Sequence, residues 1–168
     1  MTSAELLADA FGRVQEIVHD AVDGLTASQL TARLDGDANS IAWLCWHLAR
    51  VEDVHVAGAF GVPQVWLEYG KRFELPFEPS DIGYGHSSGQ VSQVTVSSAD
   101  LLVGYHDAVH EQTIRLVSDI TDADLTRVVD EAFDPPVTLS VRLVSVISDC
   151  LQHAGQASFI RGILLRRD

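Results

Sequence analysis

The sequence has few cysteines, few basic residues and no long apolar run. Its 168 residues include only two cysteines, Cys45 and Cys150, which is too few for a disulfide framework and suits a reducing cytoplasm. There are 11 basic against 24 acidic side chains, and a net charge of −13 repels nucleic acid. No stretch approaches the roughly 18 apolar residues of a membrane span, and no basic secretory leader is evident. The sequence therefore predicts a cytoplasmic protein with neither nucleic acid nor membrane as a partner.

Motifs of several common enzyme classes are also missing. The chain has no glycine-rich dinucleotide loop, no P-loop, no Cys-x-x-Cys pair and no Gly-x-Ser-x-Gly elbow. Nucleotide-binding, zinc-ribbon and serine-hydrolase functions therefore have no support. What is present is an ordinary globular composition, 46% apolar and 21% charged, over a length that fits a single domain, residues 1–168.

Apolar residues recur at helical spacing in four long segments. These segments are residues 3–23, about 40–60, about 98–118 and 138–165. Asn39 or Ser40 is expected to cap the second helix, and Ser97 or Ser98 the third. Because almost no strand pattern is present, the sequence predicts an all-α fold, a four-helix bundle.

Residues 61–97 lose this periodicity. They hold several glycines and prolines together with five large aromatic side chains. A loop of this length in a compact domain is usually functional or disordered, and the aromatic content argues against disorder. We expect a long ordered excursion between the second and third long helices, with one short helix near residues 64–71.

Asp149 and His153 are four residues apart in the last helix, so both side chains can reach one ion. They also belong to a polar stripe that any solvated helix face would show, and periodicity alone favours that interpretation. His47 lies on a mostly apolar face of the second helix, where a lone histidine is more often a hydrogen-bonded core residue. Two histidines and a carboxylate from two helices, however, are a common set for a divalent metal with open positions.

The remaining histidines give weaker signals. His106 and His110 have the spacing of a metal-binding pair, but Asp107 and Glu111 beside them indicate a solvated face. His55, eight residues after His47, is a candidate for supporting a metal ligand.

These residues carry a resemblance to the DinB-like superfamily. The sequence is most similar to its actinobacterial branch, which includes the metal-binding domain of mycothiol-dependent maleylpyruvate isomerase. The matching segments are residues 39–53, Asn-Ser-Ile-Ala-Trp-Leu-Cys-Trp-His-Leu-Ala-Arg-Val-Glu-Asp, and residues 153–161, which begin His-Ala-Gly-Gln. The resemblance implies a bundle with one divalent ion held by His47, Asp149 and His153. The position of Asp149 is histidine in many members and glutamate in the isomerase branch, and aspartate is one methylene shorter than glutamate.

The resemblance also implies an activity. Characterised members are thiol S-transferases, in which a metal activates a low-molecular-weight thiol such as mycothiol to attack a small electrophile. Zinc, nickel or iron would suit the site, with a slight preference for zinc. Arg50, Gln156 and Arg161 are candidate substrate-binding residues, no catalytic residue is assigned, and a homodimer is expected. The additional domain of the isomerase is missing, so isomerase activity is not implied. A non-catalytic metal-binding or dimeric scaffold and a metal-dependent hydrolase are the alternatives.

Overall fold

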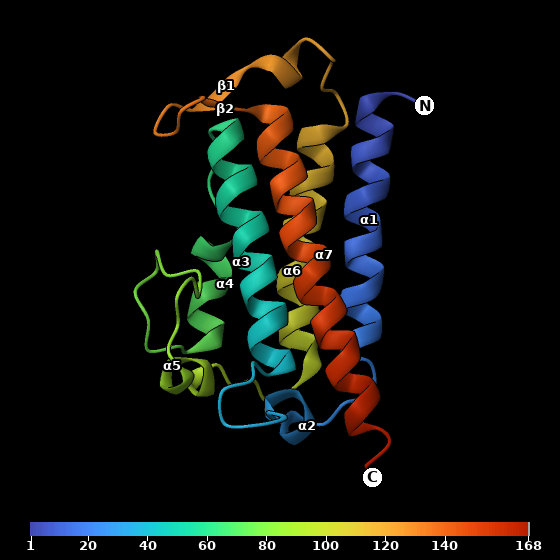
Figure 1. The fold of residues 1–168 in the computed structure, drawn as a ribbon, viewed down its shortest axis with the longest axis vertical. Helices are drawn as coiled ribbons and strands as arrows, with labels where there is room; N and C mark the ends of the chain where they lie inside the picture. Colours follow the sequence, from blue (N-terminus) through green and yellow to red (C-terminus); the bar gives the residue numbers. More distant parts are fainter. Residues whose placement is uncertain (168) are drawn as a thin grey trace.

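Four long helices form the body of the structure (Figure 1). The computed structural model describes residues 1–167. The long helices are α1 (Ser3–Val22), α3 (Ile41–Phe60), α6 (Ala99–Val117) and α7 (Leu139–Leu164). Each begins and ends within one residue of a segment with helical periodicity, so the predicted all-α four-helix bundle is confirmed.

Helix α3 is the most buried of the four long helices. It is diagonally opposite α1, and each of these two helices packs against both α6 and α7. Sixteen of the 20 residues of α3 are buried, because the excursion that follows it covers the side that the bundle leaves open. This explains why the apolar pattern of α3 is not confined to one face, and why its few polar side chains lie inside the protein.

The helix ends follow the capping signals of the sequence. The Ser40 hydroxyl accepts a hydrogen bond from the backbone N–H of Trp43 at 3.1 Å, so Ser40 is the N-cap of α3. Gly61 ends the same helix in the left-handed region, with φ of 67°, which glycine adopts without steric cost. Thr138 caps α7 in the same way as Ser40. Ser98 is the N-cap residue of α6, although its side chain makes no capping bond.

The excursion is ordered and contains two short helices, α4 (Trp66–Phe73) and α5 (Ser88–Gln93). The first was expected and begins two residues later than predicted, whereas the second was not expected. Two buried charges of α3 hold the segment in place. Arg50 donates to the backbone carbonyl groups of Pro79 and Asp81, and Asp53 accepts two backbone N–H groups at the start of α4 at 2.8 and 2.9 Å.

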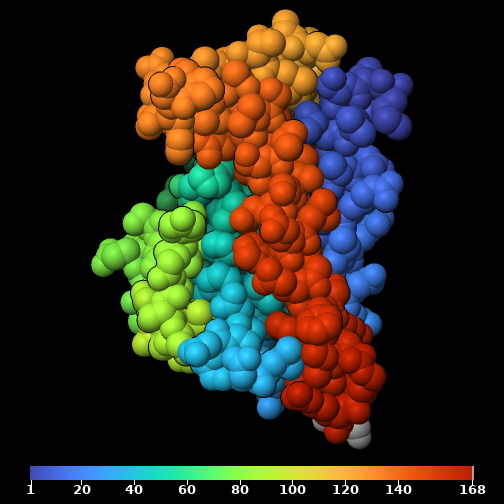
Figure 2. Space-filling view, in the orientation of Figure 1, coloured from blue at the N-terminus to red at the C-terminus, as the bar shows by residue number. Residues whose placement is uncertain are grey.

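The excursion leaves part of α3 uncovered. Figure 2 shows α3 as a strip between the excursion on one side and α7 on the other. Side chains of α3 that point into this strip therefore lie between residues of the excursion and residues of α7.

Small elements complete the fold. Helix α2 (Ala27–Thr31) follows α1, and a 3₁₀ turn, η1 (Asp124–Thr126), precedes an antiparallel pair of strands, β1 (Val128–Asp130) and β2 (Val137–Thr138). The hairpin was not predicted, because strands of three and two residues are too short for an alternating pattern. Within residues 1–167, no helix has both the length and the apolar run required to cross a membrane.

Candidate metal centre

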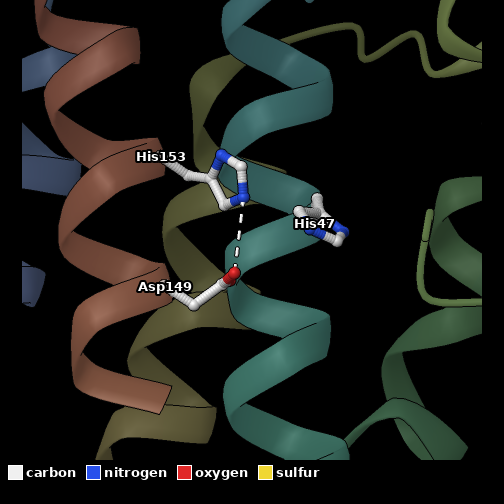
Figure 3. Close-up of side chains that lie close together, drawn as sticks. All are labelled: His47, Asp149 and His153. Atoms are coloured by element: carbon white, nitrogen blue, oxygen red, sulfur yellow. Dashed lines mark ion pairs between the residues drawn. The ribbon is translucent and has the colours of Figure 1, made fainter. Parts of the chain in front are cut away.

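Three potential metal ligands meet where α3 faces α7 (Figure 3). His47 comes from α3, and Asp149 and His153 come from successive turns of α7. One donor atom from each of the three lies within 4.8 Å of the other two. The His153 Nε2 and Asp149 Oδ1 atoms are 3.6 Å apart. The three residues predicted from the sequence are therefore brought together, and the arrangement could hold a metal ion.

A backbone carbonyl group of the excursion fixes the orientation of the His47 ring. Its Nδ1–H donates to the backbone carbonyl of Ile82, which leaves the lone pair on Nε2. The ring also stacks on Trp43, with centroids 4.6 Å apart and planes at 17°. A hydrogen bond from one ring nitrogen to a backbone carbonyl is the usual support for a histidine that binds a metal through the other nitrogen. His47 is thus a hydrogen-bonded core residue as well as a potential ligand.

Gly83 allows the excursion to come this close. Its φ is 90°, and a Cβ atom built at this position would lie 3.0 Å from the His47 Nδ1 and 2.9 Å from the Trp46 ring. A side chain is therefore excluded by both the backbone conformation and the available space. Glycine at this position lets the Ile82 carbonyl reach the imidazole.

Burial and charge adjust the three groups in different ways. Burial lowers the pKa of His47, so this imidazole is neutral at pH 7 and able to bind a metal. The close contact between the Asp149 carboxylate and the His153 imidazole lowers the pKa of Asp149 and raises that of His153. A proton on His153 therefore competes with a metal ion for the same nitrogen.

The chemistry of the donor set fits a divalent cation. Asp149 and His153 have side-chain exposures of 38% and 19%, so both are only partly open to solvent. The Asp149 Oδ2 atom is buried and has no hydrogen-bond partner among residues 1–167. A buried carboxylate oxygen without a partner is costly, and a cation would satisfy it. Three protein ligands would leave coordination positions open to another molecule.

A cavity of about 200 Å³ lies beside two of the three potential ligands. His47 and Asp149 form part of its wall, together with His55, Tyr84 and Arg142. The Arg142 guanidinium donates to Asp130 at 2.6 Å and to His55 Nδ1 at 3.2 Å. His55 therefore carries its proton on Nε2.

Sequence reasoning did not single out Arg142, which the structure places at this cavity. The signal was present, because Arg142 lies seven residues before Asp149, which is two helical turns and the same face of α7.

The three candidate substrate-binding residues have different positions. The guanidinium of Arg50 is fully buried and is occupied by Gln64 and Tyr105 as well as by carbonyl groups of the excursion. Arg161 is on the surface and donates to the backbone carbonyl of Asp23 at the end of α1. Gln156 is exposed, and a side-chain contact from it helps to raise the pKa of His153. Of the three, Gln156 is therefore the residue linked to a proposed metal ligand.

The comparison with protein families identifies the chain. The model of the DinB superfamily matches residues 10–157, a segment that includes all three potential ligands. The chain belongs to the DinB superfamily. This confirms the superfamily resemblance seen in the sequence, whereas the isomerase-like branch stays a prediction.

A solved structure agrees with this assignment. The DinB-superfamily chain is similar to one described as the crystal structure of a conserved protein of locus from Enterococcus faecalis, with 29% identity and a TM-score of 0.87. The match covers 96% of each chain, so the similarity extends over almost the whole fold. The description states no activity for that protein. No curated protein matched the sequence.

Proposed function

We propose that this DinB-superfamily protein is a metal-dependent S-transferase that joins a low-molecular-weight thiol, such as mycothiol, to a small electrophile. The observation that supports it most is the set His47, Asp149 and His153, of which His47 and Asp149 line a cavity of about 200 Å³. A divalent ion held there would lower the pKa of a thiol bound to it, so that the nucleophilic thiolate forms at neutral pH.

The thiol must come from outside the protein. Cys45 and Cys150 are buried, and burial raises the pKa of Cys45 to about 12 and that of Cys150 well above its usual value. Both are therefore thiols at pH 7 and shielded from any electrophile. In the proposed reaction, the external thiol loses its proton to water and its sulfur forms a bond to the electrophilic carbon. The leaving group of the electrophile departs with the electrons of the bond that breaks.

Residues of the cavity have roles in binding rather than in bond formation. Arg142 is held in place by Asp130, so that its cationic head lies beside His55 and the cavity. A carboxylate on either substrate would pair with this guanidinium and accept the Nε2–H of His55. We therefore assign anion binding to Arg142 and His55, in place of the buried Arg50.

Metal content and turnover test this proposal together. The wild-type protein and the His153→Ala variant, purified in parallel, are analysed for metal and assayed with mycothiol and a generic electrophile such as monobromobimane. We expect the variant to carry one equivalent of metal less than the wild type. Its turnover should fall by more than the roughly 10–100-fold that follows loss of a residue that only supports a metal ligand. Equal metal content in both proteins would rule out the site.

Two further measurements separate the alternatives. Arg142→Met is expected to raise the KM for an acidic substrate more than it lowers kcat, and Arg115→Met, an exposed arginine of α6, is the matched control. Turnover that does not depend on the thiol would instead indicate a hydrolase. Metal binding without turnover would indicate a scaffold. The homodimer, the metal and the natural electrophile stay predictions.

A further inference from the structure

A second set of metal-ligand side chains lies inside the bundle, on the other side of α3. Glu52 of α3 faces His106 of α6, and both side chains are fully buried. His110, one turn along α6, stacks on His106 with ring centroids 6.4 Å apart and planes at 18°. The sequence pointed to a solvated face here, and this expectation is wrong for His106. Asp107, which prompted it, points instead toward α1, where it pairs with His19.

The polar atoms of this cluster have no partners. Both carboxylate oxygens of Glu52, both ring nitrogens of His106 and the Nδ1 of His110 are buried without a hydrogen bond from residues 1–167. Buried polar groups in native proteins are almost always satisfied, and a group of them on neighbouring side chains is explained by a bound water or ion. Five such atoms on three neighbouring side chains therefore call for a partner that the bundle itself does not supply.

The spacing favours an ion over a direct contact. The His106 Nε2 and Glu52 Oε2 atoms are 3.6 Å apart, which is too long for a hydrogen bond between nitrogen and oxygen. Two ligands of a tetrahedral zinc ion, with bonds of about 2.0–2.2 Å, lie about 3.4 Å from each other. The same separation of 3.6 Å is found between Asp149 and His153.

The two clusters are also built in the same way. In the centre described above, α3 contributes one ligand and a neighbouring helix contributes two, four residues apart. Here α3 contributes Glu52, and α6 contributes His106 and His110, which are again four residues apart. A carboxylate and two imidazoles are ligands that zinc accepts.

We propose that Glu52, His106 and His110 bind a second divalent cation in the interior of the bundle. This ion holds α3 to α6, and it lies among buried side chains rather than at the cavity beside His47. The proposal does not rest on the S-transferase activity, since no substrate reaches a closed interior site. The proposal requires the His110 side chain to rotate, because among residues 1–167 only His47, Asp149 and His153 already have their donor atoms gathered as a set of three.

Zinc binding in the absence of the first site tests the proposal. The variant Asp149→Asn/His153→Ala loses two of the three ligands of the first site, and it is refolded after chelation and titrated with zinc against a chromophoric chelator. We expect it to bind one equivalent, and zinc to raise its Tm. A folded variant that binds no zinc would overturn the proposal, and this outcome leaves the first site and its activity untouched.

Added substitutions locate the ion. Glu52→Gln, or His110→Gln at the half-buried edge, is expected to abolish the remaining equivalent and the zinc-dependent rise in Tm. Glu111→Gln and His19→Gln remove an exposed carboxylate and a partly exposed histidine nearby, and should leave both unchanged. If Glu52→Gln lowers the Tm equally with and without zinc while zinc still binds, Glu52 is only a structural ion-pair residue and the assignment is wrong.

Discussion

The close approach of the excursion to His47 can be tested by adding a single methyl group at Gly83. Gly83→Ala would place a Cβ atom 3.0 Å from the His47 Nδ1 and 2.9 Å from Trp46, at a residue with φ of 90°. The left-handed conformation costs an alanine about 1–2 kcal/mol. Overpacking against two buried rings adds about 1–3 kcal/mol. We expect the Ile82 carbonyl to move away from the imidazole and the orientation of His47 to be lost.

Gly85 offers a matched control two residues further on. Its φ is 73°, and a Cβ atom built there meets no atom within 4 Å. Gly85→Ala therefore has a similar backbone cost and a similar effect on the unfolded chain, but it makes no contact with the metal centre. The difference between the two variants isolates the contact with His47 and Trp46, and we expect about 1–3 kcal/mol from it.

Two assays measure this difference. In a chain of this size each kcal/mol corresponds to about 2–4 °C in Tm, so metal-free Gly83→Ala should melt about 2–12 °C below Gly85→Ala. The affinity for zinc at the first site should fall about 10–100-fold in Gly83→Ala only, because a ligand loses its supporting hydrogen bond. Equal Tm and equal affinity in the two variants would show that the Ile82 contact does not position His47.

Three other predictions follow from the buried charges and thiols. Asp149→Asn removes the carboxylate that raises the pKa of His153, so NMR titration of the metal-free protein should give a lower pKa for His153. The free energy of unfolding of the wild type should therefore fall as the pH rises through that raised pKa, whereas that of the variant should not. Identical titration curves for His153 in the two proteins would show that Asp149 does not pair with it. A pKa of about 12 leaves about one Cys45 thiolate in 10⁵ at pH 7, so an aromatic disulfide reagent should label the native protein only upon unfolding, and rapid native labelling would contradict this. Arg50→Lys keeps the charge but leaves buried acceptors unpaired, so it should lower the free energy of unfolding in urea by about 1–3 kcal/mol. Arg115→Lys, at an exposed site, should change it by about 0.5 kcal/mol or less, and equal effects would show that Arg50 does not hold the excursion in place.

The helices could be predicted because the spacing of apolar residues that indicates a helix is a local property of the sequence. Periods of 3.6 residues and capping residues such as Ser40 are properties of a few consecutive positions. The β1–β2 hairpin and α5 were missed for the opposite reason. The residues of α5, Ser-Gly-Gln-Val-Ser-Gln, contain one buried apolar side chain, and its start depends on a reciprocal cap at Ser87. Elements this short have no period to read.

The site was predictable only in part. Spacing placed Asp149 and His153 on one face of a helix. Whether that face meets solvent or another helix depends on the position of α3, which lies about 100 residues earlier in the chain. The same limit produced the error at His106. Charged neighbours were read as a sign of solvent, although one residue further along a helix is a rotation of about 100° and faces a different partner. The periodicity of a sequence shows which residues share a face of a helix, but the element packed against that face determines what those residues contact.

The support of His47 shows why the non-periodic excursion matters for the site. Trp43 stacks on His47 and donates through its indole N–H to His86 Nδ1 at 3.1 Å. His86 Nε2 then donates to Asp81 at 3.0 Å, and Asp81 accepts the backbone N–H of Gly83 at 2.7 Å. This chain of hydrogen bonds returns to the turn whose carbonyl holds the imidazole. Because it joins residues some 40 positions apart through a segment without a repeating pattern, the orientation of the His47 imidazole follows from the folded excursion and not from the sequence of its own helix.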